Sequence, residues 1–164
     1  MDVKGIIKSL IKLLRNSKIV KANIMLLEPN KRLIGKRVII TGGSRGLGFS
    51  MAKKFVAEGA KVLITGCNEQ SLICYDVTDF EHMDEFVSKA DNMLGGANVL
   101  VNNAGISLHE GTIRNVHYEQ FDRQVDVNLK GVYFLSQKFL ALYEKGQRNG
   151  GSILLLSSER GQHA

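Results

Sequence analysis

The sequence predicts an α/β protein with a doubly wound parallel sheet and helices on both faces. After Pro29, short apolar and β-branched runs alternate with segments in which apolar residues recur at helical spacing, an order typical of parallel sheets covered by helices. A glycine-rich turn separates the first such strand from the first helix. The length of 164 residues, 44% of them hydrophobic, is enough for one domain with a sizeable core.

The expected domain spans residues 33–164, and its elements follow in order. Short apolar runs predict strands at 37–41, 61–65, 72–77, 98–102 and 152–158. Helical spacing of apolar residues predicts helices at 49–60, 78–94 and 118–145. The second helix is expected to open with a capping box formed by Thr78 and Glu81.

Residues 1–32 form a basic N-terminal extension. Residues 1–37 hold ten lysines or arginines and two acidic residues, so this part carries +8 and the rest of the chain −2. A mildly acidic body lacks the electrostatic footprint of a nucleic-acid-binding protein, and we expect no such partner. Apolar residues between Ile6 and Leu14 gather on one face of an amphipathic helix. We expect this helix to pack on its own domain or a partner subunit; membrane-surface attachment and a neutral tail are the alternatives.

The connection between the second and third strands is unusually short. Only residues 66–71 separate them, whereas a crossover between parallel neighbours needs a dozen residues or more. An antiparallel hairpin would fit this length but would contradict the predicted fold. We therefore expect parallel strands, and we expect the sequence to lack residues of the full protein between Gly66 and Leu72.

The turn TGGSRGLG is the clearest candidate site. Gly42, Gly46 and Gly48 have the spacing G-xxx-G-x-G between a predicted strand and a predicted helix. The pyrophosphate of a dinucleotide needs backbone amides at a helix N-terminus, and glycines allow close approach of the backbone. The predicted nucleotide-binding residues of this turn are Gly42, Ser44, Arg45, Gly46, Leu47 and Gly48.

Four motifs in order, TGGSRGLG, NNAG, VDVNLKGVYF and GGSILLLSS, resemble those of the classical short-chain dehydrogenases/reductases. The similarity runs from about Leu33 to Gly161, and in overall character it is nearest to 3-oxoacyl-carrier-protein reductases. The resemblance implies a Rossmann fold and hydride transfer between a nicotinamide coenzyme and a ketone or alcohol, with 3-oxoacyl thioesters as one substrate class. The alternative is a non-catalytic nucleotide-binding relative that acts through protein partners.

The resemblance also assigns coenzyme-binding roles downstream of the glycine turn. Asp76, with Val77 beside it, matches the acid that hydrogen-bonds the adenine ring; a helix-leading aspartate is the alternative. Asn103, Ala104 and Gly105 match residues that line the ribose side and hold the central sheet. An acid at the end of the second strand would favour NAD, but Gly66 and Cys67 stand there. Arg45 stands where NADP-preferring relatives place a phosphate-binding base; a solvated turn arginine is the alternative. We expect NADP, with NAD as the second choice.

Two catalytic residues are implied in the same way. Ser158 matches the serine that binds the substrate's carbonyl or hydroxyl oxygen, and Asn128 matches the asparagine that positions a proton relay. The family's tyrosine, with a lysine four residues after it, has no counterpart in this sequence. Because the sequence ends six residues after Ser158, we expect this pair beyond residue 164.

Other features limit the remaining function classes. Cys67 and Cys74 offer neither a disulfide framework nor zinc spacing, and the four histidines are scattered, so we expect a cytoplasmic protein without a metal site. The resemblance implies a homodimer or homotetramer, formed through the helix that contains Asn128 and the helix expected after Ser158.

Overall fold

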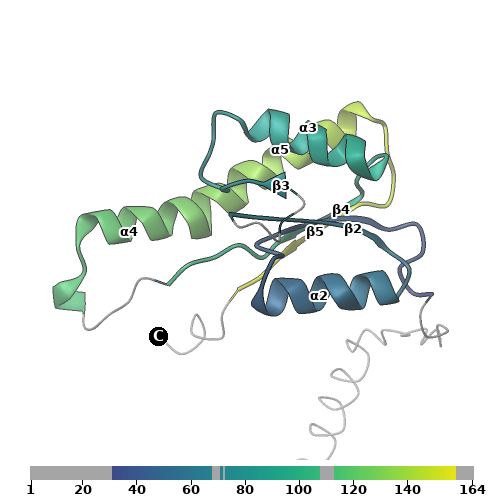
Figure 1. The fold of residues 1–164 in the computed structure, drawn as a ribbon. Coiled ribbons are helices and arrows are strands. Elements are labelled where there is room, and N and C mark those ends of the chain that lie inside the picture. The colour runs from purple at the N-terminus through teal and green to yellow at the C-terminus, as the bar shows by residue number, and fades with distance from the viewer. Residues whose placement is uncertain (1–30, 68–70, 72, 108–112, 158–164) are drawn as a thin grey trace, which may run out of the picture.

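The computed structural model describes residues 31–67, 71, 73–107 and 113–157. Five parallel strands form one sheet in the order β3-β2-β1-β4-β5 (Figure 1). They are β1 Arg37–Thr41, β2 Lys61–Gly66, β3 Ile73–Cys74, β4 Val99–Asn102 and β5 Ser152–Leu155. The predicted parallel sheet is confirmed. The predicted amphipathic helix of the extension lies outside the described residues.

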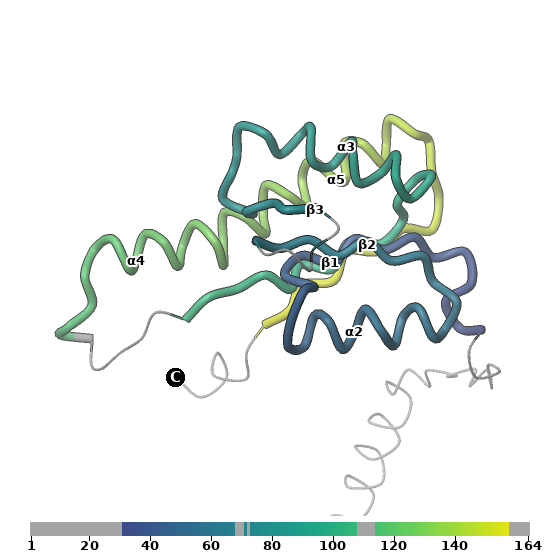
Figure 2. The backbone as a smooth tube through the Cα atoms, viewed as in Figure 1, coloured from purple at the N-terminus to yellow at the C-terminus, as the bar shows by residue number. Residues whose placement is uncertain are grey.

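Helices cover both faces of this sheet. The helical elements are α2 Gly46–Ala57, α3 Met83–Leu94, the 3-10 turn η1 Ile113–Asn115, α4 Tyr118–Val125, the π-helical η2 Asp126–Gly131 and α5 Val132–Lys145. The backbone tube shows α2 on one side of the sheet and α3 with α5 on the other (Figure 2). The doubly wound arrangement that the alternating segments predicted is therefore present.

Two hydrophobic cores result from the alternation of side chains along the strands. Ile39 of β1 belongs to the cluster beneath α3 and α5, whereas its neighbours Val38 and Ile40 belong to the cluster beneath α2. All three side chains are at most 1% exposed. Because successive strand residues point to opposite faces, a continuous apolar run such as RVIIT serves both cores.

The β2–β3 pair is parallel although its connection is short. Thr65 pairs with Ile73 and Gly66 pairs with Cys74, so the described part of β3 runs beside only the last two residues of β2. Because β3 pairs only with the carboxyl end of β2, the chain does not have to run back along the full length of β2 before β3 begins. A long crossover is therefore not needed. The expected gap between Gly66 and Leu72 falls largely on residues outside the description.

Several element boundaries differ from the predictions. The helix predicted for 49–60 begins and ends three residues earlier, and β3 and β5 are shorter than the strands predicted for 72–77 and 152–158. The helix expected from residue 78 begins at Met83 with His82 as its N-cap, and the predicted capping box is wrong because the Thr78 hydroxyl instead donates to Asp76 Oδ1 at 2.8 Å. The long helix predicted for 118–145 is present, but its middle, Asp126–Gly131, is π-helical. This local widening surrounds Asn128, whose side chain bonds to another segment.

A partly buried ion pair closes the end of the sheet away from the glycine turn. Arg148 donates from Nη1 to Asp91 Oδ1 at 2.5 Å and from Nη2 to Asp91 Oδ2 at 2.8 Å. The same carboxylate accepts the Ala97 N–H at 2.6 Å, and Arg148 also donates to the Ala97 carbonyl at 3.1 Å. This clasp joins the end of α3, the turn before β4 and the loop after α5.

Candidate functional site

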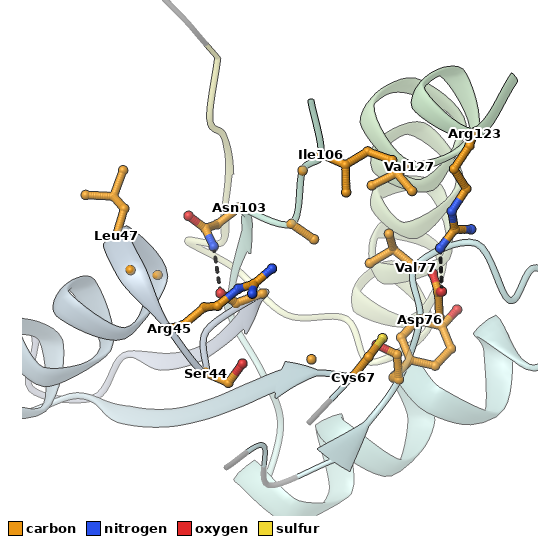
Figure 3. A pocket seen from close by; sticks show the side chains of 17 residues that line it. Ser44, Arg45, Leu47, Cys67, Asp76, Val77, Asn103, Ile106, Arg123 and Val127 are labelled. Atoms are coloured by element: carbon orange, nitrogen blue, oxygen red, sulfur yellow. Dashed lines mark hydrogen bonds and ion pairs between the residues drawn. The ribbon is translucent and has the colours of Figure 1, made fainter. Parts of the chain in front are cut away.

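The carboxyl ends of β1 to β4 meet at a cavity of about 430 Å³. Its walls come from the glycine turn, the ends of β2 and β3, the loop after β4, and the long helix, which contributes Arg123 and Val127 (Figure 3). Every residue predicted to bind the coenzyme lines it: Gly42, Ser44, Arg45, Gly46, Leu47, Gly48, Asp76, Val77, Asn103, Ala104 and Gly105. The fold thus gathers residues that are up to 63 positions apart in sequence into one cleft.

The glycines of the turn serve different purposes. Gly46 has a φ of +56° and open space around it, so it is needed for backbone conformation. Gly48 is needed for close packing, because a Cβ there would lie 2.4 Å from Asn103 Nδ2 and 2.6 Å from the Gly42 carbonyl oxygen. The N-cap of α2, Arg45, makes no side-chain capping hydrogen bond. The turn therefore presents at the cavity a helix N-terminus that its N-cap side chain does not cap, which suits an anionic group.

Asn103 ties the loop after β4 to the glycine turn. Its Nδ2 donates to the carbonyl oxygens of Thr41 at 2.8 Å and of Gly42 at 3.0 Å. The backbone N–H groups of Asn103 and Ala104 both donate to Thr41 Oγ1 at 3.0 Å. These bonds fix the two walls of the cavity relative to each other, in keeping with the implied role of NNAG in holding the central sheet.

Asn128 holds the same loop from the helix side. Its Oδ1 accepts the Ile106 N–H at 2.9 Å, and its Nδ2 donates to the Ile106 carbonyl at 2.8 Å. The neighbouring Val127 lines the cavity. The side chain of Asn128 is therefore engaged in positioning the loop, while its expected part in a proton relay stays a prediction. Ser158 lies outside the described residues; its neighbour Ser157 is exposed after β5.

Asp76 stands at the rim of the cavity in an ion pair with Arg123. Arg123 Nη2 donates to Asp76 Oδ2 at 2.9 Å (Figure 3), and Arg123 Nη1 donates to Thr78 Oγ1 at 2.6 Å. Burial raises the pKa of Asp76, but hydrogen bonds from Thr78 and Arg123 outweigh it and hold that pKa below its usual value. Asp76 is thus an ionised acceptor. Sequence reasoning missed Arg123, since no local pattern marks a partner 47 residues away.

The end of β2 has no acidic side chain. A Cβ on Gly66 would lie 2.9 Å from both Ser44 Oγ and Ser71 Oγ, so the space that an acid would need is occupied by hydroxyl groups. Cys67, the next residue, lines the cavity and remains largely exposed. Partial burial raises the pKa of its thiol. Arg45 extends into the cavity from the glycine turn (Figure 3).

Tyr75 also lines the cavity, but its hydroxyl is engaged structurally. Its ring stacks on Phe86 with the centroids 3.9 Å apart, and its hydroxyl donates to the Asp79 carbonyl at 2.8 Å. Burial raises the pKa of the phenol well above its ordinary value. Tyr75 is therefore poorly suited to exchange a proton with a substrate.

The described residues hold neither a cluster of metal ligands nor a helix that could cross a membrane. No group of three or more histidine, cysteine or carboxylate side chains among these residues has the arrangement to hold a metal ion. No helix within the same residues has the length and apolar character needed to cross a bilayer.

Comparison with known proteins gives consistent matches. The family model for short chain dehydrogenases matches residues 36–164. The chain is 33% identical over 144 residues to galactitol 2-dehydrogenase of Agrobacterium fabrum, covering 80% of this chain and 56% of the relative. It is 36% identical over 143 residues to a 3-alpha-(or 20-beta)-hydroxysteroid dehydrogenase of Mycobacterium tuberculosis, covering 79% of this chain and 54% of the relative. The chain thus spans little more than half the length of these curated relatives.

Solved structures agree with the family match. A 3-ketoacyl-(acyl-carrier-protein) reductase from Brucella melitensis complexed with NADH aligns with a TM-score of 0.73 at 31% identity, covering 80% of this chain and 61% of that chain. A short chain dehydrogenase from Burkholderia cenocepacia in complex with NADP aligns with a TM-score of 0.63 at 32% identity, covering 68% and 52%.

Proposed function

The chain belongs to the short chain dehydrogenase family, and we propose that it binds NADP and takes part in hydride transfer between the nicotinamide ring and a ketone or alcohol. The observation that carries this proposal is the single cavity lined by all eleven residues that the sequence motifs implied for coenzyme binding. The glycine turn would hold the pyrophosphate, Asp76 the adenine, and the loop after β4 the ribose next to the nicotinamide.

The preference for NADP over NAD rests on the end of β2. An acid in this position would bind the ribose hydroxyls of NAD and repel a 2′-phosphate. Here Gly66 is flanked by the hydroxyls of Ser44 and Ser71, and the cation Arg45 reaches into the cavity. Hydroxyl groups and a guanidinium suit a phosphate, because they donate hydrogen bonds to its oxygens and balance its charge.

The reaction needs a proton as well as a hydride. When bound, the coenzyme supplies hydride at C4 of its nicotinamide ring. As a carbonyl carbon accepts hydride, its oxygen must gain a proton to become an alcohol. Ser158 is proposed to hydrogen-bond that oxygen, and a tyrosine with a lysine four residues on is proposed to provide the proton. The substrate class, 3-oxoacyl thioesters included, belongs to this proposal.

A titration of the chain with NADPH and with NADH tests the coenzyme assignment. We expect both to bind, NADPH more tightly, as followed by nicotinamide fluorescence. Gly48→Val serves as a matched negative control, because its side chain would occupy the space between the turn and Asn103. If the unmodified chain binds neither nucleotide, the proposal fails.

Turnover is tested separately, in a protein that carries this chain together with the tyrosine and lysine. Reduction of a ketone with consumption of NADPH supports the oxidoreductase. If such a protein binds NADPH and turns over no carbonyl compound or alcohol, the non-catalytic alternative is favoured.

Assembly into a homo-oligomer is a further part of the proposal. Phe121, Leu129 and Tyr133 of the long helix are between 59% and 63% exposed. Large apolar side chains gathered on one exposed helix support an interface there.

A further inference from the structure

Asp76, Thr78 and Arg123 form a closed ring of hydrogen bonds at the rim of the cavity. Thr78 donates to Asp76 Oδ1 twice, from its backbone N–H at 2.9 Å and from its hydroxyl at 2.8 Å. Arg123 donates to Asp76 Oδ2 at 2.9 Å and to Thr78 Oγ1 at 2.6 Å. The ring joins the segment after β3 to α4, and both of its charged members, Asp76 and Arg123, line the cavity.

The ring leaves one acceptor position open. A carboxylate oxygen accepts two hydrogen bonds, and Asp76 Oδ1 already receives two. Asp76 Oδ2 receives one, from Arg123, and the side chain of Asp76 is 38% exposed. The carboxylate therefore has one remaining acceptor position, on Oδ2. Because Asp76 lines the cavity, a ligand bound there could reach this position.

Arg123 also determines the charge and direction of this acceptor. An unpaired carboxylate at the rim would repel a dinucleotide, whose phosphates are negative, whereas the paired one is close to neutral overall. The planar guanidinium bonds two different oxygens at once, which holds the carboxylate in one orientation. A lysine ammonium has no such fork and would leave the carboxylate free to rotate.

We infer that Arg123 is a positioning residue for base recognition: with Thr78 it orients Asp76 so that the carboxylate accepts a hydrogen bond from the 6-amino group of adenine in the coenzyme. This inference rests on the proposed binding of a nicotinamide adenine dinucleotide. It makes Arg123 a determinant of base specificity, although it lies on α4 and not on any strand end. Thr78 completes the ring from the opposite side.

The test uses two ligands that differ at one edge of the base. Reduced nicotinamide hypoxanthine dinucleotide phosphate carries a carbonyl oxygen where NADPH carries the 6-amino group, and a proton on N1 where adenine has a lone pair. Both ligands report binding through the same nicotinamide fluorescence, so the ratio of their dissociation constants measures recognition of this edge. We expect the unmodified chain to bind NADPH at least about tenfold more tightly, the scale of one charge-assisted hydrogen bond.

Four variants and a control then separate positioning from general structure. Arg123→Met is expected to bring the ratio to about threefold or less, and Arg123→Lys to leave it between Arg123→Met and the unmodified chain. In an Asp76→Ala background, which has no acceptor at this position, Arg123→Met should change the ratio no further, because Arg123 is proposed to act only through the carboxylate of Asp76. Arg114→Met, on the exposed η1 turn outside the cavity, is expected to keep the original ratio.

The outcomes are distinct. A ratio that stays unchanged in Arg123→Met, or equal losses of affinity for both ligands, would overturn the inference, because a merely structural link cannot read the base. Equal binding of both ligands by the unmodified chain would overturn it as well. Failure of the unmodified chain to bind NADPH at all would instead refute the proposed function.

Discussion

Arg45 contributes a guanidinium group to a cavity in which the facing residues Gly66 and Cys67 carry no negative charge. If Arg45 binds the 2′-phosphate, Arg45→Ala should weaken NADPH binding by about 1.5–3 kcal/mol, the range for a hydrogen bond to a charged group. NADH binding should barely change, because it has no phosphate at that position. Calorimetric titration of both nucleotides measures the difference, and equal losses would contradict the assignment of Arg45.

A second prediction for a single residue concerns Ser158. Its hydrogen bond to the substrate oxygen should strengthen as negative charge develops there, so Ser158→Ala should lower kcat by about 10²–10³. Coenzyme affinity should persist, because the glycine turn and Asp76 are unchanged. The measurement is steady-state kinetics in a protein that carries the tyrosine and lysine.

Ser157→Ala is the matched control for this comparison. In the strand that the sequence predicts for residues 152–158, adjacent side chains would point to opposite faces, so Ser157→Ala should lower kcat much less than Ser158→Ala. A larger loss of kcat in Ser157→Ala than in Ser158→Ala would show that the roles were assigned to the wrong serine.

At the scale of elements, the clasp between Asp91 and Arg148 joins α3, β4 and the loop after α5. Asp91→Ala removes a carboxylate whose side chain is 9% exposed, leaves the Ala97 N–H without its acceptor and leaves Arg148 with the Ala97 carbonyl in place of its ion pair. Its cost in free energy of unfolding should be about 3 kcal/mol, the range for breaking a buried pair. Urea unfolding at neutral pH measures it.

Asp84→Ala on the same helix is the control. Asp84 pairs with Lys138 at 2.6 Å, but its side chain is 72% exposed, so its loss should cost less than about 1 kcal/mol. Similar costs for the two variants would mean that burial does not set the strength of the clasp.

The clasp also predicts a dependence of stability on pH. Burial raises the pKa of Asp91, but hydrogen bonds from Arg148 and the Ala97 N–H outweigh it, so the folded-state pKa is below the ordinary value. A depressed carboxyl pKa stabilises the fold fully above the unfolded value of about 3.9, and the contribution is lost as the pH falls through the folded value. The difference in unfolding free energy between Asp91→Ala and the unmodified chain should therefore shrink in acid. A constant difference down to strongly acidic pH would contradict it.

The strands were predictable from sequence, whereas the helix boundaries were less so. Runs such as RVIIT and NVLVN are apolar, β-branched and bounded by turn residues, so each identifies a buried strand locally. The start of α3 was misplaced because the Thr78 hydroxyl donates to Asp76 Oδ1 and accepts from Arg123 Nη1, instead of accepting a backbone N–H as an N-cap would. The π-helical segment at Asp126–Gly131 could not be read from spacing, since it depends on the bonds between Asn128 and the distant Ile106.

The candidate site likewise contains residues that the sequence predicted and one that it did not. Glycine spacing and the NNAG motif are local, and they led to residues that all line the cavity. Arg123 was missed because its partners, Asp76 and Thr78, lie on another element, and an arginine on a helix usually faces solvent. Ion pairs and hydrogen bonds between residues far apart in the sequence, such as those of Arg123, can be identified only once the arrangement of the strands and helices is known.

For the whole molecule, ligand binding should raise the resistance to unfolding. The cavity joins four strand ends and the long helix, so an occupied cavity stabilises the native state and not the unfolded chain. At a concentration of NADPH about 100 times its dissociation constant, the gain should be about 2.7 kcal/mol. Thermal unfolding with and without NADPH measures it, with AMP as a control that lacks the nicotinamide half; no shift with NADPH would contradict binding at this cavity.

The strand order has a consequence for the way the chain is made. The described residues that line the cavity lie between Gly42 and Val127, whereas β5, which pairs with β4, comes from Ser152–Leu155. At a ribosomal rate of about 5–20 residues per second, synthesis reaches β5 roughly one to six seconds after Val127. During that interval β4 has an open edge that fixes the register for the arriving strand, Val99 opposite Ser152 through Asn102 opposite Leu155. We therefore expect β5 to add to a template that the nascent chain already contains.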